Sequence, residues 1–414
     1  MTEENRWLTD QWWTTPHNFS DEVRQQFSLP DKIYIHDVTL RESMQSPRVY
    51  FTPEEKIRIA KALDKLGVYS IEIGMYMSEV EKEVTRKLIK MQRSGEIKPK
   101  VVPLIHWNET DVDAALECGA ERVILSQSIN PWAAKNLHNV SETELIERLS
   151  RIISYAKNAG LYITTQIYDT YRAPLEFLER ATKTIVLEAG ADSVAISDTR
   201  GCALPWTVTA MVRKIKSWIP GTPLEHHGHN PFGLATAVML AAATGGAEVL
   251  HTSINNLGES VGNAATEEVA IACELFLGIK TGINLEQIYP VCNLVAELSK
   301  HPIARNKPIT GENMFITGSG QVAWRNLKFS KTERPFENMA FLPEVIGKKG
   351  MIEAILGVGC GKTIIRDRLD SLGISATEQQ LDEIVDKVKE EARLLKWSVS
   401  DIQFDEIVKE VLGK

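Results

Sequence analysis

The sequence has no cluster of lysine and arginine, no long apolar run and no paired cysteines. Its 414 residues carry 47 basic and 55 acidic side chains, a net charge of −8, so a nucleic-acid role has no electrostatic basis. The longest uncharged run, residues 231–247, contains Thr, Gly and Ala and is too short to span a bilayer. Five scattered cysteines argue against a disulfide framework and a thiolate zinc site. Residues 1–10 lack a secretory signal pattern, so we expect a cytoplasmic protein that binds neither nucleic acid nor membrane.

Between about residues 33 and 275, short β-rich runs alternate with longer runs of helical period. Eight such units predict an α/β fold, a (β/α)8 TIM barrel, rather than an open doubly wound sheet, which usually needs fewer units. The expected strands cover residues 33–37, 70–74, 101–105, 122–126, 161–168, 193–197, 223–227 and 248–253. Helices are expected over 53–66, 141–158, 174–188 and 206–218, with left-handed caps at Gly67, Gly119, Gly160 and Gly190.

The flanking sequences differ from the repeated units. We expect four parts: an N-terminal aromatic arm over 1–30, the catalytic barrel over 31–280, a linker subdomain over 281–340 and a smaller, mainly helical C-terminal subdomain over 341–414. The arm is expected to pack its tryptophans, Trp7, Trp12 and Trp13, on the barrel or on a partner subunit. After Thr377, apolar residues at spacings of three and four predict a helix with Leu381, Ile384, Val385 and Val388 on one face.

Ionisable side chains gather where the expected strands end, and in a TIM barrel these ends form the mouth that holds the active site. His227 and His229 are two residues apart on an extended segment, so both imidazoles point to one side and can reach one cation. Alone, this pair more often faces solvent or a satisfied core. Glu42 at another strand end completes a set of ligands that is common for a divalent metal.

Arg41 directly precedes Glu42. A metal-bound 2-oxo acid gains negative charge on its carbonyl oxygen when a carbon–carbon bond forms, and a fixed guanidinium can stabilise that charge. The alternative for Arg41 is a surface ion pair with a neighbouring acid, and the sequence does not decide between the two.

These segments resemble the signatures of the metal-dependent HMG-CoA lyase-like barrel family, which includes 2-isopropylmalate, homocitrate and citramalate synthases. The family pattern D-x-T-L-R-[DE]-x-x-Q resembles residues 37–45, and H-x-H-N-D-x-G-L-A resembles residues 227–235. G-E-R-x-G-N-A resembles residues 258–264, and D-T-x-G resembles residues 198–201. The order and spacing agree over roughly residues 33–275.

The resemblance implies a role for individual residues. It implies binding of Mg²⁺, Mn²⁺ or Zn²⁺ by Glu42, His227 and His229, with Asn263 as a further ligand or close neighbour. It implies that Arg41 stabilises the oxyanion and that the substrate contacts are Gln45, Thr199 and Glu259. The implied reaction is a Claisen condensation of an acyl-CoA, acetyl-CoA in the first instance, with a 2-oxo acid to give a 2-hydroxy dicarboxylic acid. The implied assembly is a homodimer.

Other positions depart from the family pattern. Tyr168 stands where the synthases have a glutamate, and Val322 stands where they have a catalytic histidine. The nearest counterparts of a later tyrosine are Phe336 and Phe341, Pro231 replaces an aspartate and Ser260 replaces an arginine. A base is still required to deprotonate a thioester. The candidates are His106, Tyr168, Asp169 and His251, of which His106 and Asp169 join Arg41 as the predicted catalytic residues.

Two alternatives to the synthase remain open. One is a metal-dependent carbon–carbon lyase or aldolase that cleaves a 3-hydroxy acid or its CoA ester. The lyase branch carries a catalytic cysteine in the third signature, and residues 257–260 contain none, which favours the synthase. The other alternative is a catalytically silent binding protein, and the intact Arg41, Glu42, His227 and His229 argue against it.

Overall fold

The computed structural model describes residues 6–74, 78–334, 337–350 and 353–413. The chain forms two compact units: residues 15–303, and residues 1–14 together with 304–414. Within the described ranges, no helix is both long and apolar enough to cross a membrane.

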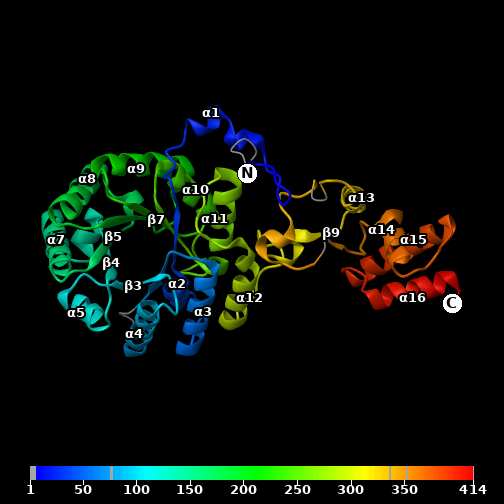
Figure 1. Cartoon of the computed structure of the whole chain (residues 1–414), viewed down its shortest axis with the longest axis horizontal. Helices are drawn as coiled ribbons and strands as arrows, with labels where there is room; N and C mark the ends of the chain where they lie inside the picture. The colour runs from blue at the N-terminus through cyan, green and yellow to red at the C-terminus, as the bar shows by residue number, and fades with distance from the viewer. Residues whose placement is uncertain (1–5, 75–77, 335–336, 351–352, 414) are drawn as a thin grey trace. The chain divides into compact units, whose positions relative to one another are not determined.

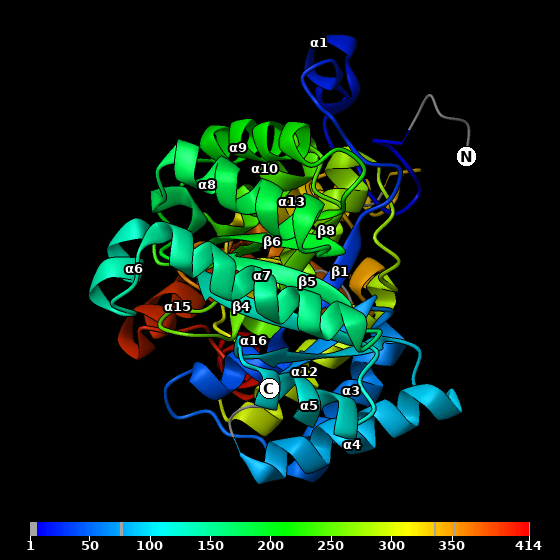
Figure 2. The same cartoon turned by 90° about the vertical axis from the view of Figure 1, so that its left-hand side faces the viewer.

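The first unit is a closed barrel of eight parallel strands in sequence order, so the predicted TIM barrel is confirmed. Figures 1 and 2 show its helices on the outside of the strands. Closure comes from β1, which pairs with β2 on one side and with β8 on the other. The strands are β1 (Tyr34–Asp37), β2 (Ser70–Ile73), β3 (Lys100–Ile105), β4 (Arg122–Ser128), β5 (Tyr162–Tyr168), β6 (Ser193–Asp198), β7 (Leu224–Gly228) and β8 (Val249–Thr252).

Local sequence signals set the helix boundaries. The helix α3 begins after Thr52, whose hydroxyl accepts a hydrogen bond from the Glu55 amide (3.3 Å) while the Glu55 carboxylate accepts one from the Thr52 amide (2.8 Å). It ends at Gly67 with φ +89°, and Gly119, Gly160 and Gly190 also have positive φ, as expected. The main barrel helices are α3 (Pro53–Leu66), α4 (Glu79–Ser94), α5 (Glu109–Glu117), α6 (Pro131–Asn136), α7 (Glu142–Asn158), α8 (Leu175–Lys183), α9 (Pro205–Trp218), α10 (Ala235–Gly245), α11 (Thr266–Ala272) and α12 (Ile288–Ser299).

Two segments differ from the sequence-based expectation. The helix expected over 174–188 is α8 followed by a π-helical turn over 184–188. The apolar helix α12 lies inside the stretch expected to be a linker with short helices, but it belongs to the barrel unit, where its buried side chains pack beside α3.

The interior of the barrel is unusually polar. TIM barrels are normally filled by Val, Ile and Leu, but here four ionisable side chains are buried between the strands: His36, Glu72, Glu225 and His251. Strand register brings them together, since His251 on β8 is the pairing partner of both His36 on β1 and His227 on β7. We call His36, Glu72, Glu225 and His251 the polar column. The apolar core of the unit therefore lies mainly between the strands and the surrounding helices.

The second unit is mainly helical. Strands β9 (Ile316–Thr317) and β10 (Glu353–Ala354) form a short parallel pair. The helices are α13 (Gly320–Phe329), α14 (Lys362–Ser371), α15 (Glu378–Leu395) and α16 (Asp401–Leu412). The predicted apolar face of α15 is confirmed, because Leu381, Ile384, Val385 and Val388 are buried in one core with residues of the other helices.

The N-terminal arm was expected to lie on the barrel or on a partner. Its residues after Thr14 do belong to the barrel unit, where the Ser28 amide donates to the Thr244 carbonyl at 2.8 Å. Its tryptophans belong to the second unit: Trp12 forms an antiparallel bridge with Phe341, and the Trp13 amide donates to the Ala340 carbonyl at 2.9 Å. The guanidinium of Arg334 lies 5.0 Å from the Trp13 ring centroid. The aromatic side chains are thus held by backbone pairing and by a cation–π contact. Phe336, one of the two counterparts of the family tyrosine, lies outside the described residues.

Candidate active site

The predicted metal ligands come together at the carboxyl ends of the strands. Glu42 lies in a single helical turn, α2 (Thr39–Glu42), directly after β1. His227 lies on β7 and His229 just beyond it. The Nε2 atoms of His227 and His229 are 3.2 Å apart, and Nε2 of His227 is 3.5 Å from a Glu42 carboxylate oxygen. The three side chains offer ligand atoms that all lie within 4.8 Å of one another.

The chemistry of these donors fits a divalent cation. Burial, together with the neighbouring His229 and Arg41, holds the pKa of His227 well below its usual range, so this imidazole is neutral and can donate a lone pair to a cation. Its Nδ1 atom is buried without a hydrogen-bond partner among the described residues, and so is Oδ1 of Asn263. Asn263 forms a β-bridge with His229. Neutral imidazole, carboxylate and amide oxygen are ligands that Mg²⁺, Mn²⁺ and Zn²⁺ accept.

Arg41 is buried between two carboxylates. Its NH1 group contacts the Glu42 carboxylate and lies 3.2 Å from the side-chain oxygen of Gln45. Its Nε–H donates to Glu72. Burial alone would raise the pKa of Glu72, but the Arg41 charge and the hydrogen bond from His36 lower it to about 2. Glu72 therefore stays ionised and fixes the orientation of the guanidinium.

A cavity of about 170 Å³ opens beside these groups. It brings together seven of the ten predicted site residues: Arg41, Glu42, Gln45, Thr199, His227, His229 and Glu259. Tyr168, one of the candidate bases, also lines the cavity, and the lining residues without a role in the sequence analysis are Leu104, Ser126, Gln166 and Ser197. The cavity wall is thus largely polar.

Three predicted residues do not line this cavity. The His106 side chain is exposed, and its Nδ1 lies 3.0 Å from Asp111 in the following turn. Asp169 is buried with a left-handed backbone (φ +61°), and Arg172 holds both of its carboxylate oxygens. Asn263 is fully buried behind the cavity wall, next to His229.

The other two candidate bases also differ in position. His251 is buried in the polar column, with Nε2 2.7 Å from a Glu225 oxygen. Tyr168 does line the cavity, and its hydroxyl accepts a hydrogen bond from Arg200 at 3.2 Å. Burial raises the pKa of Tyr168 above its ordinary value, so the phenol keeps its proton at neutral pH.

Glu72 is the functional residue that the sequence analysis left without a role. The sequence feature that could have identified Glu72 is its spacing from Ser70 on β2. Residues two apart face the same side of a strand, so both side chains point into the barrel. The partner of that face, Arg41, follows a different strand. The contact becomes visible only when the register of β1 and β2 is known.

Comparison with known proteins agrees with this geometry. The HMGL-like family model matches residues 32–295. The chain belongs to the HMGL-like family. Homocitrate synthase AksA of Methanopyrus kandleri is 34% identical over 394 residues, covering 94% of this chain and 95% of that protein. The 2-isopropylmalate synthase of Methanocaldococcus jannaschii is 35% identical, covering 94% of this chain and 74% of that protein. The (R)-citramalate synthase CimA of the same organism is 34% identical, covering 92% and 75%.

Solved structures of HMGL-like proteins share the barrel. The HMG-CoA lyase of Bacillus subtilis superposes with a TM-score of 0.57 at 24% identity, covering 67% of this chain and 97% of that protein. An HMG-CoA lyase in complex with coenzyme A and 3-methylmalate gives a TM-score of 0.56 at 22% identity, covering 66% and 93%. These likenesses concern the fold.

Proposed function

We propose that this HMGL-like protein is a divalent-metal-dependent acyltransferase that condenses acetyl-CoA with a 2-oxo acid to give a 2-hydroxy dicarboxylic acid. The observation that carries the proposal is the buried set of Arg41, Glu42, His227 and His229 at one mouth of the barrel. Relatives that cover most of this chain are named as homocitrate, isopropylmalate and citramalate synthases. All three names describe this class of reaction with different 2-oxo acids.

The proposed metal ligands are Glu42, His227 and His229, with Asn263 as a neighbour whose unpartnered oxygen is available to the ion or to a water molecule. A cation bound there supplies Lewis acidity toward the two oxygens of a 2-oxo acid. Arg41 has a separate role: its guanidinium, fixed by Glu72, stabilises the negative charge that develops on the carbonyl oxygen. Gln45 and Thr199 line the same cavity and orient the substrate carboxylate.

The proton of the thioester methyl group needs an acceptor in the cavity. His106, Asp169 and His251 do not line it, and Tyr168 holds its own proton. We assign the base role to Glu259, because its carboxylate lines the cavity and makes no hydrogen bond or ion pair among the described residues. Its backbone amide donates to Glu42 at 3.3 Å, which fixes the segment beside the metal ligands.

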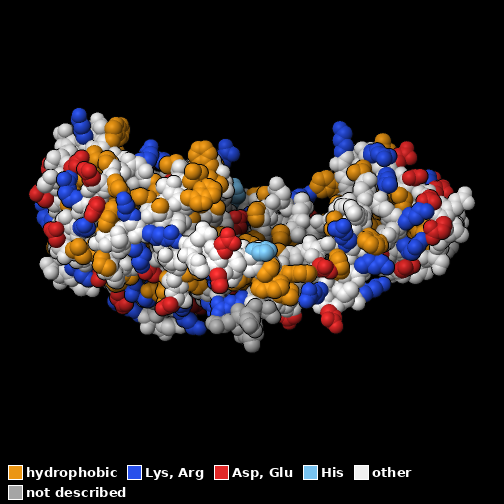
Figure 3. All heavy atoms as spheres, turned by 90° about the horizontal axis from the view of Figure 1, so that it is seen from above, with side chains coloured by type: hydrophobic (Ala, Val, Ile, Leu, Met, Phe, Trp, Pro, Cys, Tyr) orange, Lys and Arg blue, Asp and Glu red, His pale blue; other side chains and the backbone are white. Residues whose placement is uncertain are grey.

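We also propose that the protein is a homodimer. Large apolar side chains are exposed on segments that follow the strands at the cavity end of the barrel: Trp132 (66% exposed), Trp206 (78%), Phe232 (71%) and Val261 (55%). On the second unit, Leu394, Trp397 and Ile402 are also exposed. Figure 3 shows that charges of both signs are intermingled on the visible face, with orange apolar groups among them. Exposed apolar side chains of this size at the cavity end are groups that a second copy of the chain would cover, and we expect light scattering to give about twice the 46.3 kDa chain mass.

The reaction is tested by following CoA thiol release with a disulfide dye. Acetyl-CoA is offered with pyruvate, 2-oxoisovalerate, 2-oxoglutarate, glyoxylate and oxaloacetate, each with Mg²⁺, Mn²⁺ or Zn²⁺. At least one pair should release thiol. With that pair, Arg41→Ala should lower turnover about 10²-fold, the scale for loss of an oxyanion donor. Arg148→Gln serves as the matched control, because among the described residues this arginine pairs only with Glu144, one turn away on the surface of α7.

Two results would redirect the assignment. Metal-dependent cleavage of a 3-hydroxy acid or its CoA ester, without thiol release from any condensation pair, would make the protein a lyase on the same site. Metal binding without either reaction would make it a binding protein. Glu259→Gln separates the base role from substrate binding: loss of kcat with little change in the KM for the 2-oxo acid supports the base, and a rise in KM alone rejects it.

A further inference from the structure

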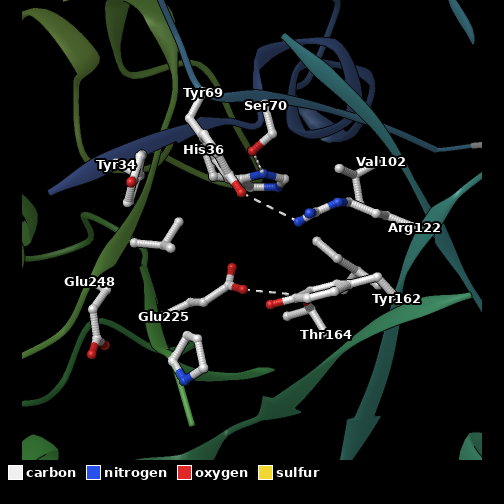
Figure 4. A pocket seen from close by; sticks show the side chains of 13 residues that line it. Tyr34, His36, Tyr69, Ser70, Val102, Arg122, Tyr162, Thr164, Glu225 and Glu248 are labelled. Carbon is white, nitrogen blue, oxygen red and sulfur yellow. Dashed lines mark hydrogen bonds between the residues drawn. The ribbon is translucent and has the colours of Figure 1, made fainter. Parts of the chain in front are cut away.

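A second cavity of about 170 Å³ lies at the opposite, amino-terminal end of the barrel strands. Its wall is made by residues at the starts of strands, among them Tyr34 on β1, Arg122 on β4 and Tyr162 on β5. Figure 4 shows these side chains around an open space. The three side chains are only partly buried, so the cavity is reached from solvent. This end of a TIM barrel ordinarily serves stability rather than binding, which makes a cavity lined by charged side chains unusual here.

The aromatic wall of the cavity is rigid. Each of its three tyrosines has a cation over its ring, with the charge 4.1–4.7 Å from the centroid: Lys32 over Tyr34, Lys100 over Tyr69 and Arg122 over Tyr162. The rings of Tyr34 and Tyr69 also contact each other, with centroids 4.5 Å apart. These contacts fix the rings in place. The cavity is therefore already formed before any ligand enters.

Arg122 brings a positive charge to this wall. Its NH1 group donates to the Tyr69 hydroxyl at 3.3 Å. Among the described residues, Arg122 forms no ion pair with a carboxylate. A partly buried guanidinium without an anionic partner is a group that a carboxylate can satisfy in a bidentate way.

Glu225 brings a negative charge to the inner end of the same cavity. One of its oxygens accepts hydrogen bonds from Thr164 (3.0 Å) and Ser193 (2.6 Å), and the other lies 2.7 Å from Nε2 of His251. These neutral donors hold the carboxylate in place and leave its charge uncancelled. Figure 4 shows Glu225 and Arg122 reaching toward the cavity from opposite sides, with Tyr162 beside them.

Two opposite charges that face one cavity without contacting each other fit a ligand that carries both charges. The Tyr34 and Tyr162 hydroxyls make no hydrogen bond among the described residues and are available to the same ligand. Val102, Ile124 and Val249 offer a small apolar surface for a side chain. The volume is that of about six water molecules, which suits a ligand of the size of a small amino acid.

We propose that this cavity binds a small zwitterionic amino acid, with its carboxylate on Arg122 and its ammonium group on Glu225. The site is separate from the proposed active site, and no residue lines both cavities. The proposal does not depend on the reaction that the protein catalyses, because it concerns equilibrium binding.

The test is isothermal titration calorimetry of the full chain with the twenty standard L-amino acids, β-alanine and γ-aminobutyrate as probes. At least one probe should bind at one site per chain. For the best binder, the matched analogues without the ammonium group and without the carboxylate should each bind at least tenfold more weakly. Binding of the carboxylic acid analogue or inorganic phosphate as tightly as the amino acid would overturn the zwitterion proposal, and so would no binding of any probe.

Variants locate the site. Arg122→Gln should weaken binding at least tenfold, and Arg122→Lys should weaken it less because it keeps the charge. Tyr162→Phe keeps the ring beneath Arg122 and removes only the hydroxyl, so a threefold to tenfold loss is expected even if Arg122→Gln does not fold. Arg148→Gln on the surface of α7 is the matched control and should bind as the parent does. Binding that survives Arg122→Gln and Tyr162→Phe but is lost in His229→Ala would place the amino acid at the metal site and overturn the proposal.

Discussion

Glu72 holds Arg41 from behind: one carboxylate oxygen accepts a hydrogen bond from the Arg41 Nε–H, and the other lies 3.0 Å from Nε2 of His36. Both residues are buried and both carry charge. The guanidinium therefore has one orientation before substrate arrives. This kind of preorganisation contributes strongly to transition-state stabilisation.

We expect Glu72→Gln to lower kcat by roughly tenfold or more, because a neutral amide no longer fixes the guanidinium against the charge of Glu42. The KM for acetyl-CoA should change little. Steady-state kinetics with the productive substrate pair measures both values. The matched control is Glu79→Gln, since Glu79 is an exposed partner of Lys82 at the start of α4. Unchanged kcat in Glu72→Gln would mean that Arg41 is oriented by its other contacts.

Metal removal should abolish activity. Dialysis against a chelator is expected to stop thiol release, and addition of Mg²⁺, Mn²⁺ or Zn²⁺ should restore it. His229→Ala removes one of three proposed ligands, so the affinity for the restoring ion should fall at least tenfold when measured by calorimetry. His301→Gln, an exposed histidine beyond α12, is the control. Equal metal affinity in His229→Ala and the parent would reject this ligand set.

Gly262 is expected to tolerate no side chain. Its φ is +90°, and an added Cβ would lie 1.6 Å from the Asn256 carbonyl oxygen. Gly221 is the matched control, because its φ is +82° but the space around an added Cβ is open. Gly221→Ala should lower the free energy of unfolding by about 1–2 kcal/mol, the energy of a left-handed backbone conformation at a non-glycine residue. Gly262→Ala should displace the segment that carries Asn263 and lower metal affinity as well as the thermal midpoint; equal midpoints in the two variants would contradict this.

Asp37 should make stability depend on pH. Burial raises its pKa from 3.8 to about 7 despite two hydrogen bonds from Thr39. Between these values the folded protein binds a proton that the unfolded chain releases, so this group makes stability fall as pH rises from about 4 to 7. Asp37→Asn mimics the protonated acid and should remove that contribution.

The comparison needs two pH values. The thermal midpoint of Asp37→Asn minus that of the parent should be larger at pH 8 than at pH 5, measured by calorimetry in the same salt. Asp31→Asn, at an exposed position just before β1, should leave the difference between the two midpoints unchanged. A parent and an Asp37→Asn variant with parallel profiles would show that the carboxyl is ionised throughout.

The sequence allowed the fold to be predicted because it depends on local patterns, and its signature motifs allowed the meeting of Glu42, His227 and His229 to be predicted. Strand and helix periods, the Thr52 cap and the positive φ of Gly67 follow from a few neighbouring residues. The directions of single side chains at the strand ends could not be predicted from such local patterns. His106 turns to Asp111 and Asp169 to Arg172, and such short-range pairs compete with the cavity for the same carboxylate or imidazole.

The second cavity could not be predicted for a different reason. In the sequence, Arg122 and Tyr162 are simply the first residues of two strands. Their contact depends on the register between β4 and β5, in which Arg122 is the pairing partner of Tyr162. The opposite placement of Glu225 depends on closure of the whole barrel. Contacts of this range have no signature in a single sequence.

The polar column also determines how the interior of the barrel tolerates substitution. Fully buried apolar residues such as Ile35, Leu63 and Leu88 lie between the strands and helices, and truncating one of them leaves a cavity. In the column, His36 contacts Glu72 and His251 contacts Glu225. Loss of one partner leaves the other buried and unsatisfied, which costs more than the loss of a surface pair. Positions inside the barrel can therefore change in pairs more readily than one at a time.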